Sequence, residues 1–240
     1  MLPAPRALLL DYGGVIVDSP EDFADEVMPS LVGRVHRLIG GVLTLDEIWA
    51  ELRRADKVRD EIRDAEGHVE PSHTRLWGEL VADLWPEPAR EAVVAHADEL
   101  TYLWAYRPSW SLVPGIAAVL EFTLGQGMPV VVVSNTRSGQ AHRDALERLG
   151  VGYAFAAQIY SDEVGVCKPH PEMIRAAARA ADVPVEACWM VGDQVNRDIA
   201  CARAAGAGGA ILMAGEPNPD ADWTVVDGHR LLALLAANVA

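Results

Sequence analysis

The segment Ala7-Leu8-Leu9-Leu10-Asp11-Tyr12-Gly13-Gly14 places a carboxylate directly after an apolar run and just before two glycines. The apolar run is typical of a short buried strand, and the glycines let the backbone approach a ligand closely. In an open α/β sheet, a side chain at the carboxyl end of a strand faces the ligand crevice. Asp11 is therefore a candidate nucleophile or metal ligand, and the alternative is an acid that only caps a loop.

Further short apolar stretches follow along the chain, and helical patterns separate them. We expect buried strands at residues 130–134, 156–160, 188–192 and 210–213. Thr136 is expected to cap a helix that runs to Leu149, Pro171 to start a second helix, and Asn196 to begin a third. This alternation of strands and helices predicts an α/β fold with a doubly wound, Rossmann-like parallel sheet.

Between residues 19 and 108 the pattern changes to helices alone, which predicts an inserted all-helical domain. The expected helix starts are Ser19-Pro20, the capping box Thr44-x-x-Glu47, Ser72 and Pro88. Arg53, Arg54, Arg59 and Arg63 are expected to form a solvated face of the second of these helices, from which one arginine could reach a substrate anion. The predicted domains are a core of residues 1–18 and 109–240 and a helical insert of residues 19–108.

Composition and charge narrow the class of protein. The chain has 240 residues, half of them apolar, and a formal net charge of -15, which argues against nucleic-acid and membrane-surface partners. No apolar stretch approaches the roughly 18 residues that cross a bilayer, so we expect a soluble, cytoplasmic protein. Cys167, Cys188 and Cys201 show no metal-binding spacing and are expected to be small core residues. The sequence leaves the oligomeric state open.

Polar residues end or closely follow the expected strands. Ser134-Asn135-Thr136 follows one strand, and its hydroxyl and amide groups could hold an anionic oxygen. Lys168, one of only two lysines in the chain, follows the next strand and its loop. Asp193 ends a further strand, and Asp198 lies in the first turn of the next helix. A parallel sheet would gather these side chains with Asp11 at one edge.

These segments resemble the motifs of the haloacid dehalogenase-like (HAD) hydrolase superfamily, in order and in spacing. The helical insert lies where that family carries its cap, so the resemblance covers nearly the whole chain. The matching segments are Leu10-Asp11-Tyr12-Gly13-Gly14-Val15, Val133-Ser134-Asn135-Thr136, Lys168-Pro169 and Gly192-Asp193-Gln194-Val195-Asn196-Arg197-Asp198.

The resemblance implies a phosphatase that acts on a small phosphorylated metabolite. Asp11 would attack phosphorus to form an aspartyl phosphate, which water then hydrolyses. Mg²⁺ would be bound by the Asp11 carboxylate, the Gly13 carbonyl oxygen, Asp193 and Asp198. Ser134, Asn135 and Lys168 would bind the phosphoryl oxygens, and Lys168 would also offset the negative charge between nucleophile and substrate.

One position departs from the family pattern. Phosphatases of the family usually carry a second aspartate two residues after the nucleophile, where it serves as general acid and base, and this chain has Gly13 there. General acid-base catalysis is typically worth about 10²–10⁴ in rate. The substrate could have a good leaving group, or Asp18, His170 or a residue of the insert could supply the proton, or the domain could be inactive.

Other functions stay open at this stage. A non-catalytic domain that binds a phosphorylated ligand or a protein partner is the main alternative, and Gly13 is its best support. Phosphonate-cleaving relatives use a lysine of the cap, for which Lys57 is the one candidate in the insert. Dehalogenating relatives usually have tyrosine at the Gly13 position and commonly lack the acid that corresponds to Asp193, so dehalogenation fits less well.

Overall fold

A parallel β-sheet forms the centre of the protein, whose computed structural model describes residues 3–18 and 23–239. The sheet has six strands, all parallel, and β1 lies between β4 and β6, with Leu9 opposite Val131 on one side and Met190 on the other. In spatial order the strands are β5 (Ala157–Tyr160), β4 (Val130–Ser134), β1 (Ala7–Leu10), β6 (Cys188–Gly192), β7 (Gly209–Met213) and β8 (Trp223–Val225).

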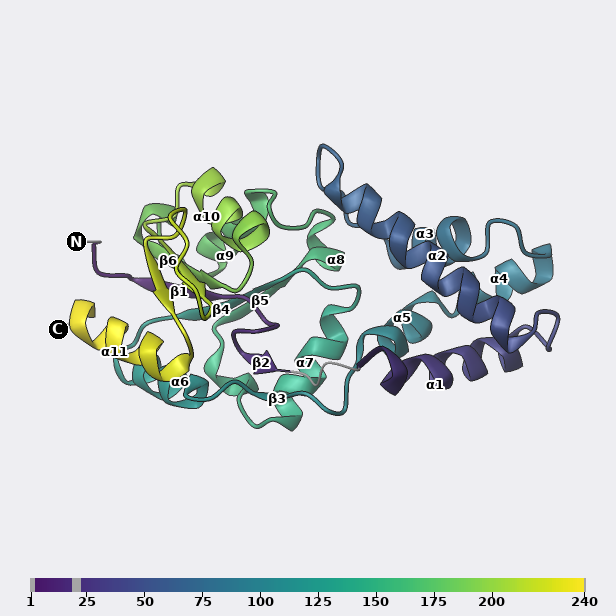
Figure 1. Cartoon of the computed structure of the whole chain (residues 1–240), viewed down its shortest axis with the longest axis horizontal. Helices are drawn as coiled ribbons and strands as arrows, with labels where there is room; N and C mark the ends of the chain where they lie inside the picture. Colours follow the sequence, from purple (N-terminus) through teal and green to yellow (C-terminus); the bar gives the residue numbers. More distant parts are fainter. Residues whose placement is uncertain (1–2, 19–22, 240) are drawn as a thin grey trace.

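Helices cover both faces of the sheet, as expected for a doubly wound fold (Figure 1). Successive side chains of a strand point to opposite faces, and accordingly Leu8 and Leu10 belong to one hydrophobic cluster while Ala7 and Leu9 belong to another. The helices and short turns of this core are α6 (Ile116–Gly125), α7 (Gly139–Arg148), η2 (Gly152–Ala154), α8 (Ser161–Val164), α9 (Glu172–Ala180), η3 (Val185–Ala187), η4 (Val195–Ile199), α10 (Ala200–Ala205) and α11 (Gly228–Val239).

A separate group of helices lies between β1 and the rest of the sheet in the sequence and extends to one side of it (Figure 1). These helices have a hydrophobic core of their own, in which Trp77 and Leu52 are fully buried. They are α1 (Phe23–Leu38), α2 (Leu45–Asp64), α3 (His73–Arg75), η1 (Leu76–Val81), α4 (Glu87–Ala95) and α5 (Ala97–Ala105). The architecture of an α/β core with a helical insert is confirmed, while the domain limits at residues 18/19 and 108/109 stay a prediction.

A short antiparallel ladder joins the insert to the core. Its strands are β2 (Val17–Asp18) and β3 (Ser111–Leu112), which pair Val17 with Leu112 and Asp18 with Ser111. The two chain crossings between core and insert are thereby held side by side. The expected helix start at Ser19-Pro20 lies outside the described residues.

Helix ends in the insert follow the sequence signals only in part. The capping box is confirmed, because the Thr44 side chain accepts a hydrogen bond from the Glu47 amide while the Glu47 side chain accepts one from the Thr44 amide. The helix expected from Pro88 to Tyr106 is instead two helices, which meet at His96.

No helix among residues 3–18 and 23–239 is long and apolar enough to cross a membrane.

Two helix starts in the core differ from the prediction. The cap of α7 is Ser138, whose side chain accepts from the Ala141 amide, whereas the Thr136 hydroxyl accepts from the Ser138 amide in the preceding turn. The helix predicted to start at Asn196 begins one residue earlier, and its first turn is the π-helical η4. The sequence prediction also missed the helices α6 and α11 and the strands β2, β3 and β8, which have only two or three residues each.

A buried ionic cluster attaches the insert to the core. Glu70, in the loop after α2, accepts a hydrogen bond from Arg59 Nε at 2.7 Å and lies 3.2 Å from Arg63 Nε. The Ser161 hydroxyl at the start of α8 donates to the same carboxylate at 2.8 Å. The prediction that Arg59 and Arg63 are solvated was therefore wrong: both side chains are buried because Glu70 and the core cover them.

We predict that Glu70→Gln destabilises the protein by about 3 kcal/mol, because it leaves two arginines buried with one carboxylate fewer. The free energy of unfolding in urea measures this change. Glu66→Gln makes the same chemical change at an exposed position of the same loop and should alter stability by no more than about 0.5 kcal/mol. Equal stability of the two variants would show that the cluster contributes nothing to the attachment.

Candidate active site

The carboxyl ends of the central strands bring three of the predicted residues together. Asp11 follows β1, Ser134 is the last residue of β4, and Asp193 follows β6. The position of Asp11 is fixed by its own backbone, whose amide donates to the Val191 carbonyl at 2.9 Å. Because neighbouring parallel strands end at the same edge, side chains far apart in the sequence meet there.

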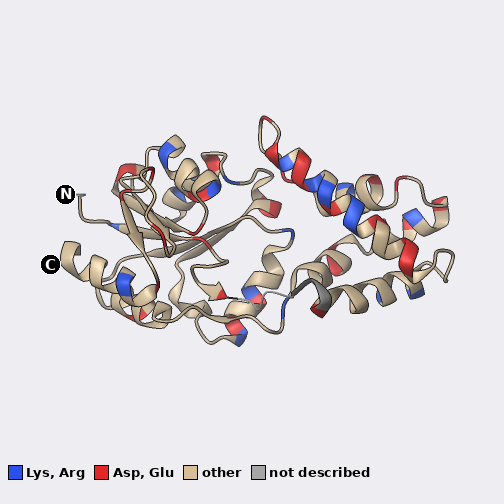
Figure 2. Ribbon diagram, in the orientation of Figure 1, with Lys and Arg blue, Asp and Glu red and all other residues tan. Residues whose placement is uncertain are grey.

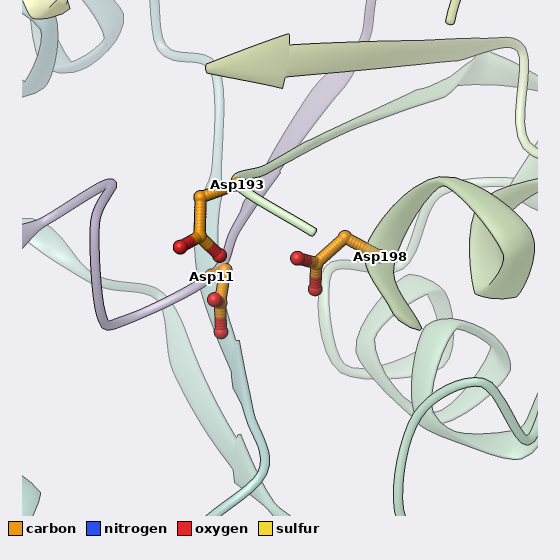
Figure 3. Close-up of side chains that lie close together, drawn as sticks. All are labelled: Asp11, Asp193 and Asp198. Atoms are coloured by element: carbon orange, nitrogen blue, oxygen red, sulfur yellow. The ribbon is translucent and has the colours of Figure 1, made fainter. Parts of the chain in front are cut away.

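Three carboxylates converge at this edge. An oxygen of each of Asp11, Asp193 and Asp198 lies within 4.8 Å of the other two (Figure 3). Asp198 comes from η4 and is held by the Gln194 amide, which donates to its Oδ2 at 2.9 Å. Oδ1 of Asp193 is buried and has no hydrogen-bond partner in the described part of the chain. Such a set of hard oxygen donors fits a divalent cation.

Lys168 lies within the acidic cluster. Its Nζ is 2.6 Å from Asp11 Oδ1 and 2.6 Å from Asp198 Oδ1, and it also donates to the Val133 carbonyl at 2.8 Å. The side chain of Asn135 fixes the backbone of Lys168, because its Nδ2 donates to the lysine carbonyl and its Oδ1 accepts from the lysine amide. The side-chain amide of Asn135 thus orients the lysine.

The pKa values reflect the crowding of charge. Burial, and then the nearby Asp198, raise the pKa of Asp11 to about 7, although Lys168 opposes the shift. Burial and Asp198 also raise the pKa of Asp193 above its ordinary value. Burial disfavours the charged form of Lys168, but Asp11 and Asp198 together bring its pKa above the ordinary value. One ammonium group is thus shared by carboxylates that repel one another.

Two glycines make room for this arrangement. Gly14 has a positive φ of +71°, and a β-carbon there would lie 2.7 Å from Asp193 Oδ2. A β-carbon at Gly192 would lie 2.1 Å from the β-carbon of Asp198. Larger residues at either position would push the carboxylates apart.

A cavity of about 300 Å³ opens next to the three carboxylates, and both the core and the insert line it. On one wall Tyr12 stacks on His142, with ring centroids 3.9 Å apart, and Trp110 packs edge-on against both rings. Burial lowers the pKa of His142 to about 3, so its imidazole is neutral at physiological pH. Arg59, Arg107, Arg137 and Arg197 also line the cavity.

Comparison with known proteins identifies the family to which this arrangement belongs. The model of a family described as haloacid dehalogenase-like hydrolase matches residues 5–206, a span that contains all three carboxylates, Lys168 and the helical insert. The chain belongs to the haloacid dehalogenase-like hydrolase family. The resemblance found in the sequence is thereby confirmed, and with it the expectation of an enzyme.

Two curated relatives of this HAD-like hydrolase are phosphatases. Glyceraldehyde 3-phosphate phosphatase of Methanopyrus kandleri is 31% identical over 166 residues, which cover 68% of this chain and 65% of that protein. Phosphoglycolate phosphatase of Nitrosococcus oceani is 28% identical over 211 residues, or 85% of this chain and 82% of that protein. The chain thus spans just under two thirds of the first relative's own length.

Solved structures agree on the fold. The HAD-hydrolase YfnB of Bacillus subtilis, crystallised bound to magnesium, superposes with a TM-score of 0.62 at 17% identity, covering 97% of this chain and 99% of that one. At this level of identity the likeness concerns the fold of the core and the insert. It makes no statement about substrate.

Only some of the other site residues predicted from the sequence line the cavity of this HAD-like hydrolase. Ser134, Asn135 and Gly13 line the cavity beside Asp11, but Asp18 and His170 do not. Lys57 lines a second cavity, which shares Arg107 and Arg137 with the first and is lined by none of the three carboxylates of the acidic cluster.

Several residues of the cavity were missed by the sequence prediction. Arg137 directly follows the segment Val133–Thr136, and this position next to the motif was the signal that could have identified it. Arg107, His142 and Trp110 gave no signal of their own, because their approach to the cavity depends on how the insert and α7 pack.

Proposed function

We propose that this protein is a phosphatase of small phosphorylated metabolites and that Asp11 is its nucleophile. The observation that carries the proposal is the meeting of Asp11, Asp193, Asp198 and Lys168 in the lining of one cavity of about 300 Å³. The phosphatase names of the curated relatives support the same reaction. A cavity of this size is at the small end of the range for ligand sites, which favours a small metabolite.

We propose Mg²⁺ as the cofactor, held by the carboxylates of Asp11, Asp193 and Asp198 and by the carbonyl oxygen of Gly13. Fully ionised, the three carboxylates carry two more negative charges than Lys168 neutralises, and the unpartnered Oδ1 of Asp193 is free to serve as a ligand. When bound, the ion offsets this charge and that of the phosphoryl group. The magnesium in the structure of YfnB is consistent with this assignment.

The side chains of this protein would share the reaction as follows. A carboxylate oxygen of Asp11 forms a bond to phosphorus while the bond from phosphorus to the leaving oxygen breaks; the leaving oxygen keeps the bonding electron pair, departs as an oxyanion and takes a proton from water to give the alcohol. The Ser134 hydroxyl, the amides of the following turn and Lys168 bind the remaining phosphoryl oxygens. Water then attacks the phosphorus of the aspartyl phosphate, which releases phosphate and restores Asp11.

Protonation of the leaving oxygen is the step that Gly13 leaves without a dedicated acid. Among the described residues, the carboxylates that line the cavity are those assigned to nucleophile and metal, and His142 is neutral. Asp18 and His170 lie outside the cavity lining, which weakens them as surrogate acids. We therefore propose that the enzyme prefers substrates with good leaving groups, such as aryl phosphates, acyl phosphates or sugar 1-phosphates.

Asp11→Asn is expected to lower phosphate release from p-nitrophenyl phosphate in Mg²⁺ by at least about 10³-fold, because the amide cannot attack phosphorus. Asp46→Asn, on an exposed turn of α2, is the matched control and should retain full activity. Far-ultraviolet circular dichroism checks that both variants are folded. If the wild-type enzyme releases no phosphate from a panel of phosphorylated metabolites, the non-catalytic ligand-binding alternative is correct instead.

Gly13→Asp should restore the missing acid and raise kcat/KM for alkyl phosphates by about 10²-fold, with a smaller gain for aryl phosphates. The position can accept the side chain, because a β-carbon at Gly13 would meet no atom within 4 Å. Gly13→Asn has the same shape without the acid and should give no gain. Alkyl phosphates that already react as fast as aryl phosphates in the wild-type enzyme would show that another group supplies the proton.

A further inference from the structure

Three arginines, which we call the arginine wall, line the same cavity as the acidic cluster. Arg59 comes from α2, Arg107 follows α5, and Arg137 follows the end of β4. Basic residues lie on the insert and on the core elements that face it (Figure 2). The proposed reaction uses none of these arginines, because Ser134 and Lys168 already bind the phosphoryl group.

The carboxylates that pair with Arg59 and Arg137 are either shared or partly exposed to solvent. The carboxylate of Glu70, which pairs with Arg59, is shared with Arg63. Arg137 pairs with Asp56, whose side chain is 41% exposed to solvent. A surface carboxylate neutralises a buried guanidinium less completely than a buried one does, because water screens the pair. Asp56 therefore neutralises the charge of Arg137 only in part, and Glu26 and Asp56 lie near enough to Arg107 to stabilise its charged form.

Arg137 is central to this wall. Its guanidinium lies 4.6 Å from the centre of the Trp104 ring, which fixes its plane. Its Nε is buried without a hydrogen-bond partner in the described part of the chain. Burial first, and then the positive charge of Arg137, lower the pKa of both Arg59 and Arg107 to about 10. The guanidinium group of Arg137 is thus close enough to repel those of Arg59 and Arg107, and an anion beside Arg137 would relieve that repulsion.

Arg107 is oriented by the backbone that leads out of the insert. Its Nη1 donates to the carbonyl oxygens of Trp104 at 2.7 Å and of Tyr106 at 3.2 Å. The planar guanidinium group matches carboxylate and phosphate oxygens with paired hydrogen bonds. Since one cavity of about 300 Å³ must contain the phosphoryl group, the carbon skeleton and this second group, the smaller anion fits better.

We propose that Arg107 and Arg137 bind a carboxylate of the substrate, and that Arg59 adds positive charge behind them. The proposal rests on the proposed function, since it takes the phosphoryl group to lie beside Asp11 and Lys168. It makes the substrate a small phosphorylated carboxylic acid, with the phosphoryl group at the acidic end of the cavity and the carboxylate at the arginine wall.

Binding of phosphonates tests the proposal without turnover. In the presence of Mg²⁺, 3-phosphonopropionate should bind at least about tenfold more tightly than propylphosphonate, which has a methyl group in place of the carboxylate. Ethane-1,2-diphosphonate, in which a second phosphonate replaces the carboxylate, should bind more weakly than 3-phosphonopropionate. Tighter binding of the diphosphonate would overturn the carboxylate assignment, because it would mean that the arginines bind a second phosphate group of the substrate. Equal affinity for all three compounds would overturn the arginine site altogether.

Variants show which residues cause the preference for 3-phosphonopropionate over propylphosphonate. Arg137→Gln should reduce the ratio of the affinities for these two compounds to about twofold or less. Arg137→Lys should restore only part of the ratio, because an ammonium group lacks the paired donors. Arg90→Gln changes an exposed arginine of α4 that lines neither cavity, and it should keep the full ratio. An equal loss in Arg90→Gln and Arg137→Gln would mean that general charge, rather than this site, attracts the carboxylate.

The two proposals fail in different ways. Phosphate release from p-nitrophenyl phosphate without a preference for 3-phosphonopropionate would leave the phosphatase and overturn the carboxylate site. A clear preference in binding without any phosphate release would retain the site and overturn the phosphatase. No binding of any of the three phosphonates at millimolar concentration would overturn the carboxylate site.

Discussion

Repulsion among carboxylates is the constraint around which this protein is arranged. Asp11 and Asp193 follow adjacent strands of a parallel sheet, and η4 adds Asp198 from the side, so three acids meet where one lysine faces them. Such a group is stable only when cations and hydrogen bonds offset its charge. Lys168 and the Gln194 amide supply part of this compensation, and Gly14 and Gly192 leave room for the carboxylates to approach.

Groups of opposite charge line the same cavity. The sheet edge is acidic and suits a divalent cation with a phosphoryl group, whereas the insert and the turn after β4 contribute arginines. The Glu70 cluster joins the two sides, because Arg59 belongs both to the cavity wall and to the contact between insert and core. Binding of a substrate with charge at both ends would therefore be coupled to the position of the insert.

Local patterns in the sequence predicted the core of the fold and the acidic side of the cavity. The apolar run followed by Asp11 and two glycines spans only eight residues, so the sequence alone identifies Asp11 as a candidate site residue. The motif that contains Asp193 and Asp198 is equally short. The arginine side was not predictable in this way. Arg59 and Arg63 have the helical spacing of a solvated face, and only the docking of Glu70 and Ser161 against them makes them buried. Thr136 was mistaken for a helix cap because a second hydroxyl, Ser138, lies two residues later.

Trapping the covalent intermediate is the most direct test of the central claim, that the first of the three carboxylates attacks phosphorus. The enzyme would be quenched with acid during turnover of an aryl phosphate in Mg²⁺, and the acyl phosphate reduced with borohydride, which converts a phosphorylated aspartate to homoserine. Peptide mass spectrometry should find homoserine at position 11 and at no other aspartate. Steady turnover with an unmodified Asp11, or with the modification at Asp193 or Asp198, would contradict the account.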